Sequence, residues 1–165
     1  MRENEAVQMF NSGMNCAQSA FAALTEDTGL DRNQAFRIAS CFGGGMRCGE
    51  VCGAVTGALM AIGLYCGYDA PDDPDAKARS NALALEFERR FIGKNGSILC
   101  RELLGYNLSV PEDLEILKSK GLFSSVCPKM VSDAVILAET MIEERTLSLN
   151  GKAVYTVPSR SLSEK

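Results

Sequence analysis

Residues 51–67 contain 17 positions without a charged side chain. A helix that spans a membrane needs about 20 apolar residues, whereas this run is shorter, rich in glycine and without a basic flank on one side. A buried helix inside a protein core satisfies the same composition. We therefore predict a central apolar helix from about residue 49 to residue 66.

Helical signals recur along most of the chain. Asn15 and Asp31 are residues that commonly cap helix N-termini, and Pro111 can open a helix that Gly121 ends. The predicted fold is all-α, a single-domain bundle of about seven helices around the central Gly/Cys-rich apolar helix. The helices are expected near residues 3–10, 15–29, 31–41, 49–66, 75–91, 111–121 and 127–145, with a short one after Ser97.

The helical pattern ends at Thr146. Residues 1–145 are therefore predicted to form the helical, cysteine-rich domain. Residues 146–165 are predicted to be an extended or disordered C-terminal tail, with a small hairpin turning at residues 150–151.

Small residues repeat every four positions in the central segment, at Gly49, Gly53, Gly57 and Ala61. On a helix this spacing makes a row without side chains, against which another backbone can pack closely. Each interior glycine costs about 0.5–1 kcal/mol relative to alanine. Close packing against a second helix, or against a bound group, is expected to compensate for that cost.

The chain has seven cysteines and no histidine, so its chemistry falls to sulfur, carboxylates and cations. The net charge is −4 and the basic residues are scattered, which disfavours nucleic acid as a partner. The polar first residues lack the apolar segment of a secretory signal. We expect a cytoplasmic protein without peripheral membrane contact, in which many thiols indicate redox or metal-binding work.

Cys48 and Cys52 would share a face in the first turn of the predicted central helix. The helix dipole and Arg47 would both favour a thiolate there, so a lowered pKa is expected for Cys48 or Cys52. Cys66 would lie about 21 Å further along the helix, as an ordinary buried cysteine. The glycines at residues 43–45 open no βαβ unit and precede no Walker lysine, which argues against a phosphate site.

Cys16, Cys100 and Cys127 each lie on or near the start of a predicted helix. They could assemble into one site in space, or each could fill a small apolar gap in the core. Spacing alone leaves these two alternatives open. No closely spaced CxxC pair is present, so thioredoxin, zinc-ribbon and ferredoxin motifs are all missing.

Residues 52–57 read Cys-Gly-Ala-Val-Thr-Gly, with one cysteine far upstream and two far downstream. This arrangement resembles the C_GCAxxG_C_C family, small proteins described as redox-active on the strength of four cysteines in this order. The flanking residues 15–18, 43–46, 100–105 and 127–129 fit too, and the similarity spans roughly residues 5–143. The resemblance implies that the working cysteines are Cys16, Cys52, Cys100 and Cys127, and that Cys41, Cys48 and Cys66 are additional.

Three functions remain open from the sequence. In the first, a redox-active protein or thiol-dependent oxidoreductase carries out thiol–disulfide exchange or electron transfer with an unidentified redox partner. Cys52 would attack, and Cys16, Cys100 or Cys127 would resolve the mixed disulfide.

The second is a metal-binding protein that holds an iron–sulfur cluster or zinc. Its ligands would be Cys16, Cys52, Cys100 and Cys127, with Cys48 as a further candidate, and Gly44, Gly45 and Gly53 would bind the cofactor. The third is a structural or accessory helical module whose cysteines fill the core. The uncharged glycine-rich helix also suggests a homodimer.

Overall fold

The computed structural model describes residues 1–148, and this part of the chain is all-α, as predicted. It has no strand; its seven helices of eight or more residues are joined by two shorter ones, α6 and α8. The α-helices are α1 (Arg2–Asn11), α2 (Cys16–Leu24), α3 (Arg32–Ala39), α4 (Gly53–Cys66), α5 (Pro74–Asn95), α6 (Cys100–Leu104), α7 (Pro111–Ser119), α8 (Leu122–Ser125) and α9 (Cys127–Ser148), and the short turns are η1 (Glu26–Thr28), η2 (Ser40–Phe42) and η3 (Gly45–Gly49).

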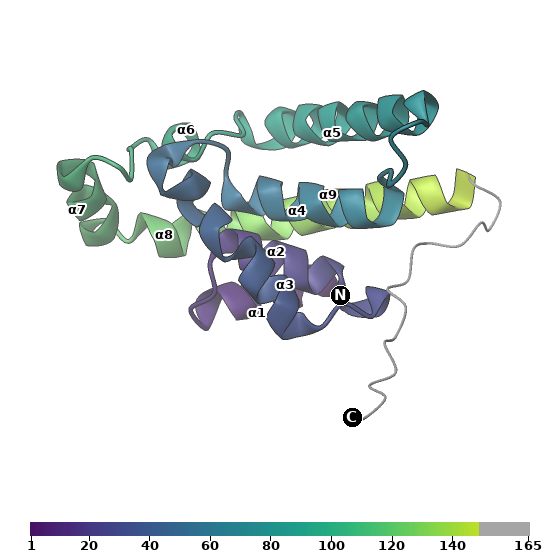
Figure 1. Ribbon diagram of the computed structural model, residues 1–165. Coiled ribbons are helices and arrows are strands. Elements are labelled where there is room, and N and C mark those ends of the chain that lie inside the picture. The colour runs from purple at the N-terminus through teal and green to yellow at the C-terminus, as the bar shows by residue number, and fades with distance from the viewer. Residues whose placement is uncertain (149–165) are drawn as a thin grey trace.

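The helices form three layers (Figure 1). The middle layer is α4 packed along α9, with α5 on one side and α1, α2 and α3 on the other. The shorter helices α6, α7 and α8 lie at one end of the bundle, next to the starts of α4 and α9. The central apolar helix predicted from the sequence is thus at the centre of the fold.

The central helix begins at Gly53, four residues later than predicted. Residues Gly44, Gly45, Met46, Arg47 and Gly49 all have positive φ, a left-handed conformation that cannot continue into a right-handed α-helix. The amide of Glu50 instead donates to the carbonyl of Gly45 and closes a wide turn. Gly49 is therefore not part of the helical glycine row.

Gly53 and Gly57 do form a close helix crossing. A Cβ at Gly57 would lie 2.5 Å from the carbonyl oxygen of Ala17, so the backbones of α2 and α4 meet there without side chains between them. Ala17 is fully buried. The prediction that the small-residue row packs against another backbone is confirmed for these two glycines.

The main core lies between these layers. Phe87 and Phe91 of α5 are fully buried and stack with 6.2 Å between ring centroids. A smaller core of Cys100, Leu104, Leu108 and Leu117 forms under the α6–α8 end. The site described below lies where these two cores meet.

A buried carboxylate connects α5 to α9. Asp133 is 6% exposed and accepts from Lys129, one turn away at 2.6 Å, and from Lys94 at the end of α5, at 2.9 Å. Burial raises the pKa of Asp133, but the two lysines outweigh it and leave the pKa below its ordinary value. The ion pairs thus hold the end of α5 against the first turns of α9, which start at Cys127.

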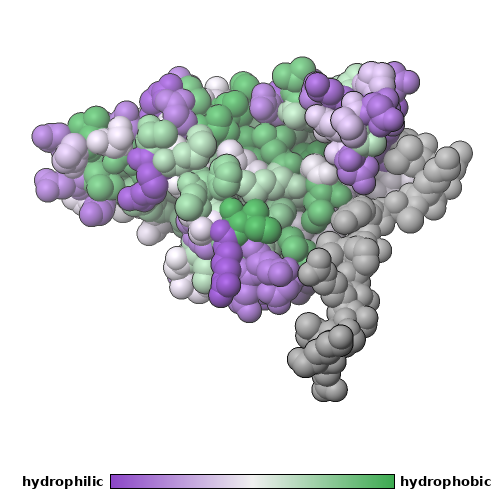
Figure 2. Space-filling model, viewed as in Figure 1, coloured by the Kyte–Doolittle hydropathy of each residue, from purple (hydrophilic) through white to green (hydrophobic). Residues whose placement is uncertain are grey.

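The face drawn in Figure 2 is apolar over its middle, where α4 lies, and hydrophilic toward its ends. Within residues 1–148 no single helix is both long enough and apolar enough to cross a membrane. Only the bent pair Pro111–Ser119 and Leu122–Leu147, taken together, has the length and hydropathy of a span.

The homodimer expected from the apolar helix stays a prediction. Helix α9 continues to Ser148, slightly past the predicted end, and the predicted tail beyond it, with its hairpin, lies outside the described residues.

Replacing Gly57 with alanine should destabilise the fold by about 1–3 kcal/mol, because its Cβ would force α2 and α4 apart. Gly63 lies in the same helix with nothing near its would-be Cβ, so Gly63→Ala should stabilise by about 0.5–1 kcal/mol. Urea unfolding followed by circular dichroism measures both changes. Equal effects of the two substitutions would contradict the close crossing.

Candidate functional site

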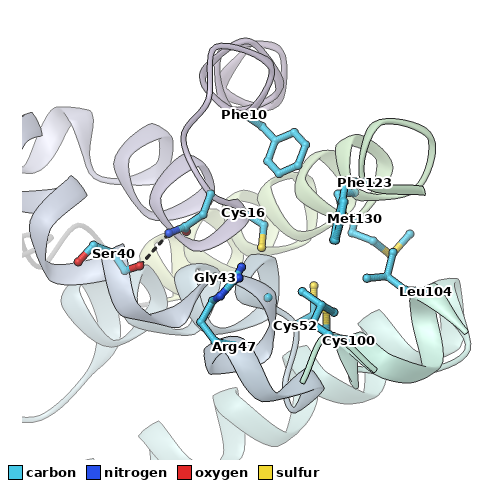
Figure 3. A pocket seen from close by; sticks show the side chains of 14 residues that line it. Phe10, Cys16, Ser40, Gly43, Arg47, Cys52, Cys100, Leu104, Phe123 and Met130 are labelled. Atoms are coloured by element: carbon cyan, nitrogen blue, oxygen red, sulfur yellow. Dashed lines mark hydrogen bonds between the residues drawn. The ribbon is translucent and has the colours of Figure 1, made fainter. Parts of the chain in front are cut away.

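Four cysteines from four separate helix starts line one cavity of about 180 Å³. Cys16, Cys100 and Cys127 are the first residues of α2, α6 and α9, and Cys52 is the N-cap residue of α4. Figure 3 shows the sulfurs of Cys16, Cys52 and Cys100 directed toward the same space. The alternative in which the cysteines fill unrelated gaps does not hold for this set.

An isolated backbone bridge brings Cys52 next to Cys100. Val51 pairs antiparallel with Leu99, the amide of Cys52 donates to Ile98 and that of Cys100 donates to Glu50, each at 2.7 Å. Cys52 and Cys100 each follow the bridged residue by one position. Because side chains alternate along extended backbone, both thiols lie on the same side of the bridge.

Asn15 and two glycines position Cys16. The Asn15 side chain accepts from the amides of Ala17 and Gln18 in a capping box, so α2 begins at the cysteine. A Cβ on Gly43 would lie 2.6 Å from the Asn15 side chain, and one on Gly53 would lie 2.5 Å from the sulfur of Cys16. The sequence predicted the cap at Asn15, but gave no sign that Gly53 makes room for a distant sulfur.

Cys16 is the thiol most easily ionised in the cavity. A hydrogen bond from the Cys52 thiol, together with amides of Gly44, Cys16 and Ala17, outweighs burial and lowers the pKa of Cys16 to about 6. The same hydrogen bond, burial and the charge on Cys16 raise the pKa of Cys52 well above its ordinary value. The expectation of a lowered pKa at Cys52 was wrong, because Cys52 donates to a thiolate that is already better solvated by amides.

Cys100 and Cys127 are neutral thiols in this arrangement. Burial, followed by the negative charge on Cys16, raises the pKa of each to about 12. Cys127 also faces the charge that Cys100 would carry if it ionised. The cavity therefore combines one thiolate with three thiols near neutral pH.

The other three cysteines lie outside the cavity. Cys48 is exposed, and its sulfur donates to the carbonyl of Gly45 at 3.2 Å. The left-handed turn separates it from Cys52, so the predicted shared helix face does not exist. Cys41 is exposed beside Ser40, and Cys66 is half-buried at the far end of α4, where burial raises its pKa.

The residues around the left-handed turn differ in their relation to the site. Gly44 lines the cavity and its amide reaches Cys16, whereas Gly45 does not line it and packs against Glu50. Met46 and Arg47 have φ of 55° and 64°, which costs about 1–2 kcal/mol for each residue with a side chain. Such strain is usually stored where a site requires it.

Apart from Asn15, Ser40, Arg47 and the glycines, the remaining walls of the cavity are apolar and come from four elements and one loop. The sequence did not predict these wall residues, because their spacing is the same as that of ordinary core residues. These wall residues are Phe10, Leu104, Phe123 and Met130, which Figure 3 labels, and Leu108.

The cysteines as arranged do not fit the metal site that the sequence left open. Among residues 1–148, no group of three or more histidine, cysteine or acidic side chains is placed so that it could hold a metal ion. A tetrahedral zinc site or an iron–sulfur cluster needs four converging thiolates.

Fold and site together define a helical protein with a buried cavity of four thiols. The family model described as "Putative redox-active protein (C_GCAxxG_C_C)" matches residues 14–141, most of the chain. The chain belongs to this C_GCAxxG_C_C family, as its cysteine pattern predicted.

A protein of Archaeoglobus fulgidus described as "Uncharacterized protein" is 34% identical over 65 residues. The matched region is 38% of this chain and 43% of that relative, so it spans less than half the relative's length. No solved structure matches the chain.

Alkylation of Cys16 should follow its lowered pKa. Iodoacetamide is uncharged and reacts with thiolates, so its rate at Cys16 should rise about tenfold per unit below pH 6 and level off above about pH 7. Mass spectrometry of quenched peptides measures this rate at each cysteine. In Cys52→Ala, which lacks the thiol donor, the curve should move to higher pH; a midpoint near 9 in the intact protein would contradict the assignment.

Proposed function

We propose that this protein is a thiol–disulfide oxidoreductase in which Cys16 is the attacking thiolate and Cys52 resolves the mixed disulfide. The observation that carries the proposal is the shared cavity: Cys16 and Cys52 both line it, and the sulfur of Cys16 lies against Gly53, the residue that follows Cys52. The pKa values of the two thiols, moved in opposite directions, support the same assignment. A thiolate with a pKa of about 6 is ionised at pH 7 and still nucleophilic. The family description as redox-active supports the same class of chemistry.

The reaction proceeds in two exchanges. The Cys16 thiolate attacks one sulfur of a substrate disulfide, the substrate S–S bond breaks, and one substrate thiolate leaves. Cys52 then loses its proton to the second departing sulfur as its own sulfur attacks Cys16. The products are a Cys16–Cys52 disulfide and two reduced substrate thiols, with two electrons passed from protein to substrate.

The order of attack follows from the environment of the two sulfurs. Once Cys16 is bound in a mixed disulfide it carries no negative charge. The hydrogen bond and the charge that hold the pKa of Cys52 high are then gone, so Cys52 ionises more easily when it is needed. The first step thus activates the second.

Cys100 and Cys127 can act only after that step. Both keep raised pKa values while Cys16 is a thiolate, and the bridge places Cys100 on the same side as Cys52. Exchange of the new disulfide with Cys100 or Cys127 would move the oxidation to a second thiol of the same cavity. The third sequence hypothesis, cysteines as core filler, is not favoured because all four thiols line one cavity and do not fill separate gaps.

The test is to oxidise the reduced protein with one equivalent of a small disulfide. The thiol count should fall by two, and peptide mapping should find a disulfide between Cys16 and Cys52. Cys52→Ser should stop at a stable mixed disulfide on Cys16, and Cys16→Ser should react more than about tenfold more slowly. Cys66→Ser is the matched control, because Cys66 is a half-buried cysteine outside the cavity and should leave the reaction unchanged. No modification of Cys16, or a disulfide without Cys52, would overturn the proposal.

A further inference from the structure

Arg47 is the single cationic side chain that lines the cavity within residues 1–148. It makes no hydrogen bond or ion pair with any other residue in this range, whereas Glu50 nearby is paired with Arg101. Arg47 is exposed, so water hydrates its guanidinium in the free protein; a carboxylate that enters the cavity could accept two parallel hydrogen bonds from it.

The backbone aims Arg47 at the cavity. Its left-handed φ folds the side chain back over Gly44, so that Nη1 lies 3.8 Å from where a Cβ of Gly44 would be. The backbone of Gly44 also contributes to the lowered pKa of Cys16. Figure 3 shows the Arg47 side chain running toward the space that the sulfurs face. Since the Cys52 thiol and backbone amides are the main groups that stabilise the Cys16 thiolate, the guanidinium is left for a ligand.

Burial limits the size of what can reach the sulfurs. Cys16 and Cys52 are 7% and 5% exposed, and the cavity measures about 180 Å³. Sites for drug-sized ligands occupy about 300–1,000 Å³, so this one suits a smaller molecule. A disulfide on the surface of a folded protein would not reach Cys16 without opening the cavity.

We infer that the substrates are small disulfides that carry a carboxylate, bound by Arg47 with the S–S bond next to Cys16. This inference rests on the proposed function and names its substrate class. The Cys16 thiolate attacks the sulfur nearer to it, and the other half leaves as a carboxylate-bearing thiolate. Cys52 then displaces the remaining half and passes it a proton, which leaves a Cys16–Cys52 disulfide. Without Arg47, the thiolate and the carboxylate would repel each other in the cavity.

The experiment compares three small disulfides that differ in charge. Dithiodiglycolate carries two carboxylates, bis(2-hydroxyethyl) disulfide is neutral and cystamine carries two ammonium groups. Single-turnover rates of Cys16–Cys52 disulfide formation are measured by acid quench and mass spectrometry. The exposed Cys41 and Cys48 are replaced by serine in all proteins so that only the cavity reacts rapidly. Each variant is compared with its parent for the same reagent, which cancels the differences between leaving thiols.

Arg47→Gln should lower the rate with dithiodiglycolate about tenfold and change the rate with the neutral disulfide less than about twofold. Arg47→Lys should recover most of the loss, because it keeps the charge. Arg37→Gln is the matched control: Arg37 is exposed, is not part of the cavity and has no ion pair in residues 1–148, so it should change neither rate. Added salt should slow the dithiodiglycolate reaction of the parent protein more than that of Arg47→Gln.

Equal loss with all three disulfides would overturn the inference, since it would mean that Arg47 shapes the site without selecting charge. An unchanged dithiodiglycolate rate in Arg47→Gln would overturn it as well. In both cases the proposed function survives as long as Cys16 and Cys52 form the disulfide. Failure of all three reagents to modify Cys16 in the parent protein would instead overturn the proposed function itself.

Discussion

The site depends on how closely α2 approaches α4. Gly57 lets the α4 backbone meet the carbonyl of Ala17, and one turn earlier Gly53 lets it meet the sulfur of Cys16. Any larger residue at either position would move the start of α2 away from the start of α4. The two helix N-termini would then separate, and the interaction between the Cys16 and Cys52 thiols would be lost. Two glycines in the Cys-Gly-Ala-Val-Thr-Gly segment therefore serve packing and chemistry through the same contact.

Low polarity makes the resulting thiol pair asymmetric. In water both thiols would have nearly the same pKa, but in a buried cavity one negative charge excludes a second. Which sulfur takes the charge is decided by the amides around it. Cys16 has three amides from its own helix start and from Gly44, whereas the amide of Ala54 is the main one that favours ionisation of Cys52. The division of roles thus comes from backbone donors, without a histidine or an acidic base.

Local sequence signals predicted the helices well and the site only in part. The capping residues Asn15 and Asp31 each act within one helix, so they can be recognised from the sequence. The left-handed turn could not, because methionine and arginine normally avoid positive φ and here adopt it only in the packed structure. For that reason the start of α4 was placed four residues too early.

The cysteines illustrate the same limit. Their order along the chain identified the working set, but their roles depend on contacts between residues far apart in the sequence. The bridge joins Val51 and Leu99, which are 48 positions apart, and no local sequence pattern predicts such a contact. Likewise, the choice of Cys16 over Cys52 as thiolate follows from where the amide of Gly44 lies in space.

The bridge between Val51 and Leu99 also fixes one end of the α4–α5 pair, whereas the connection between the two helices at the other end can change length. It closes the α4–α5 hairpin at its open end, while the connection at residues 67–73 lies at the other end of α4, about 21 Å away along the helix axis. A longer loop at that connection would add residues far from the four cavity cysteines and should leave their positions unchanged. The connection is accordingly a suitable place to graft a fluorescent reporter or an affinity tag onto this protein.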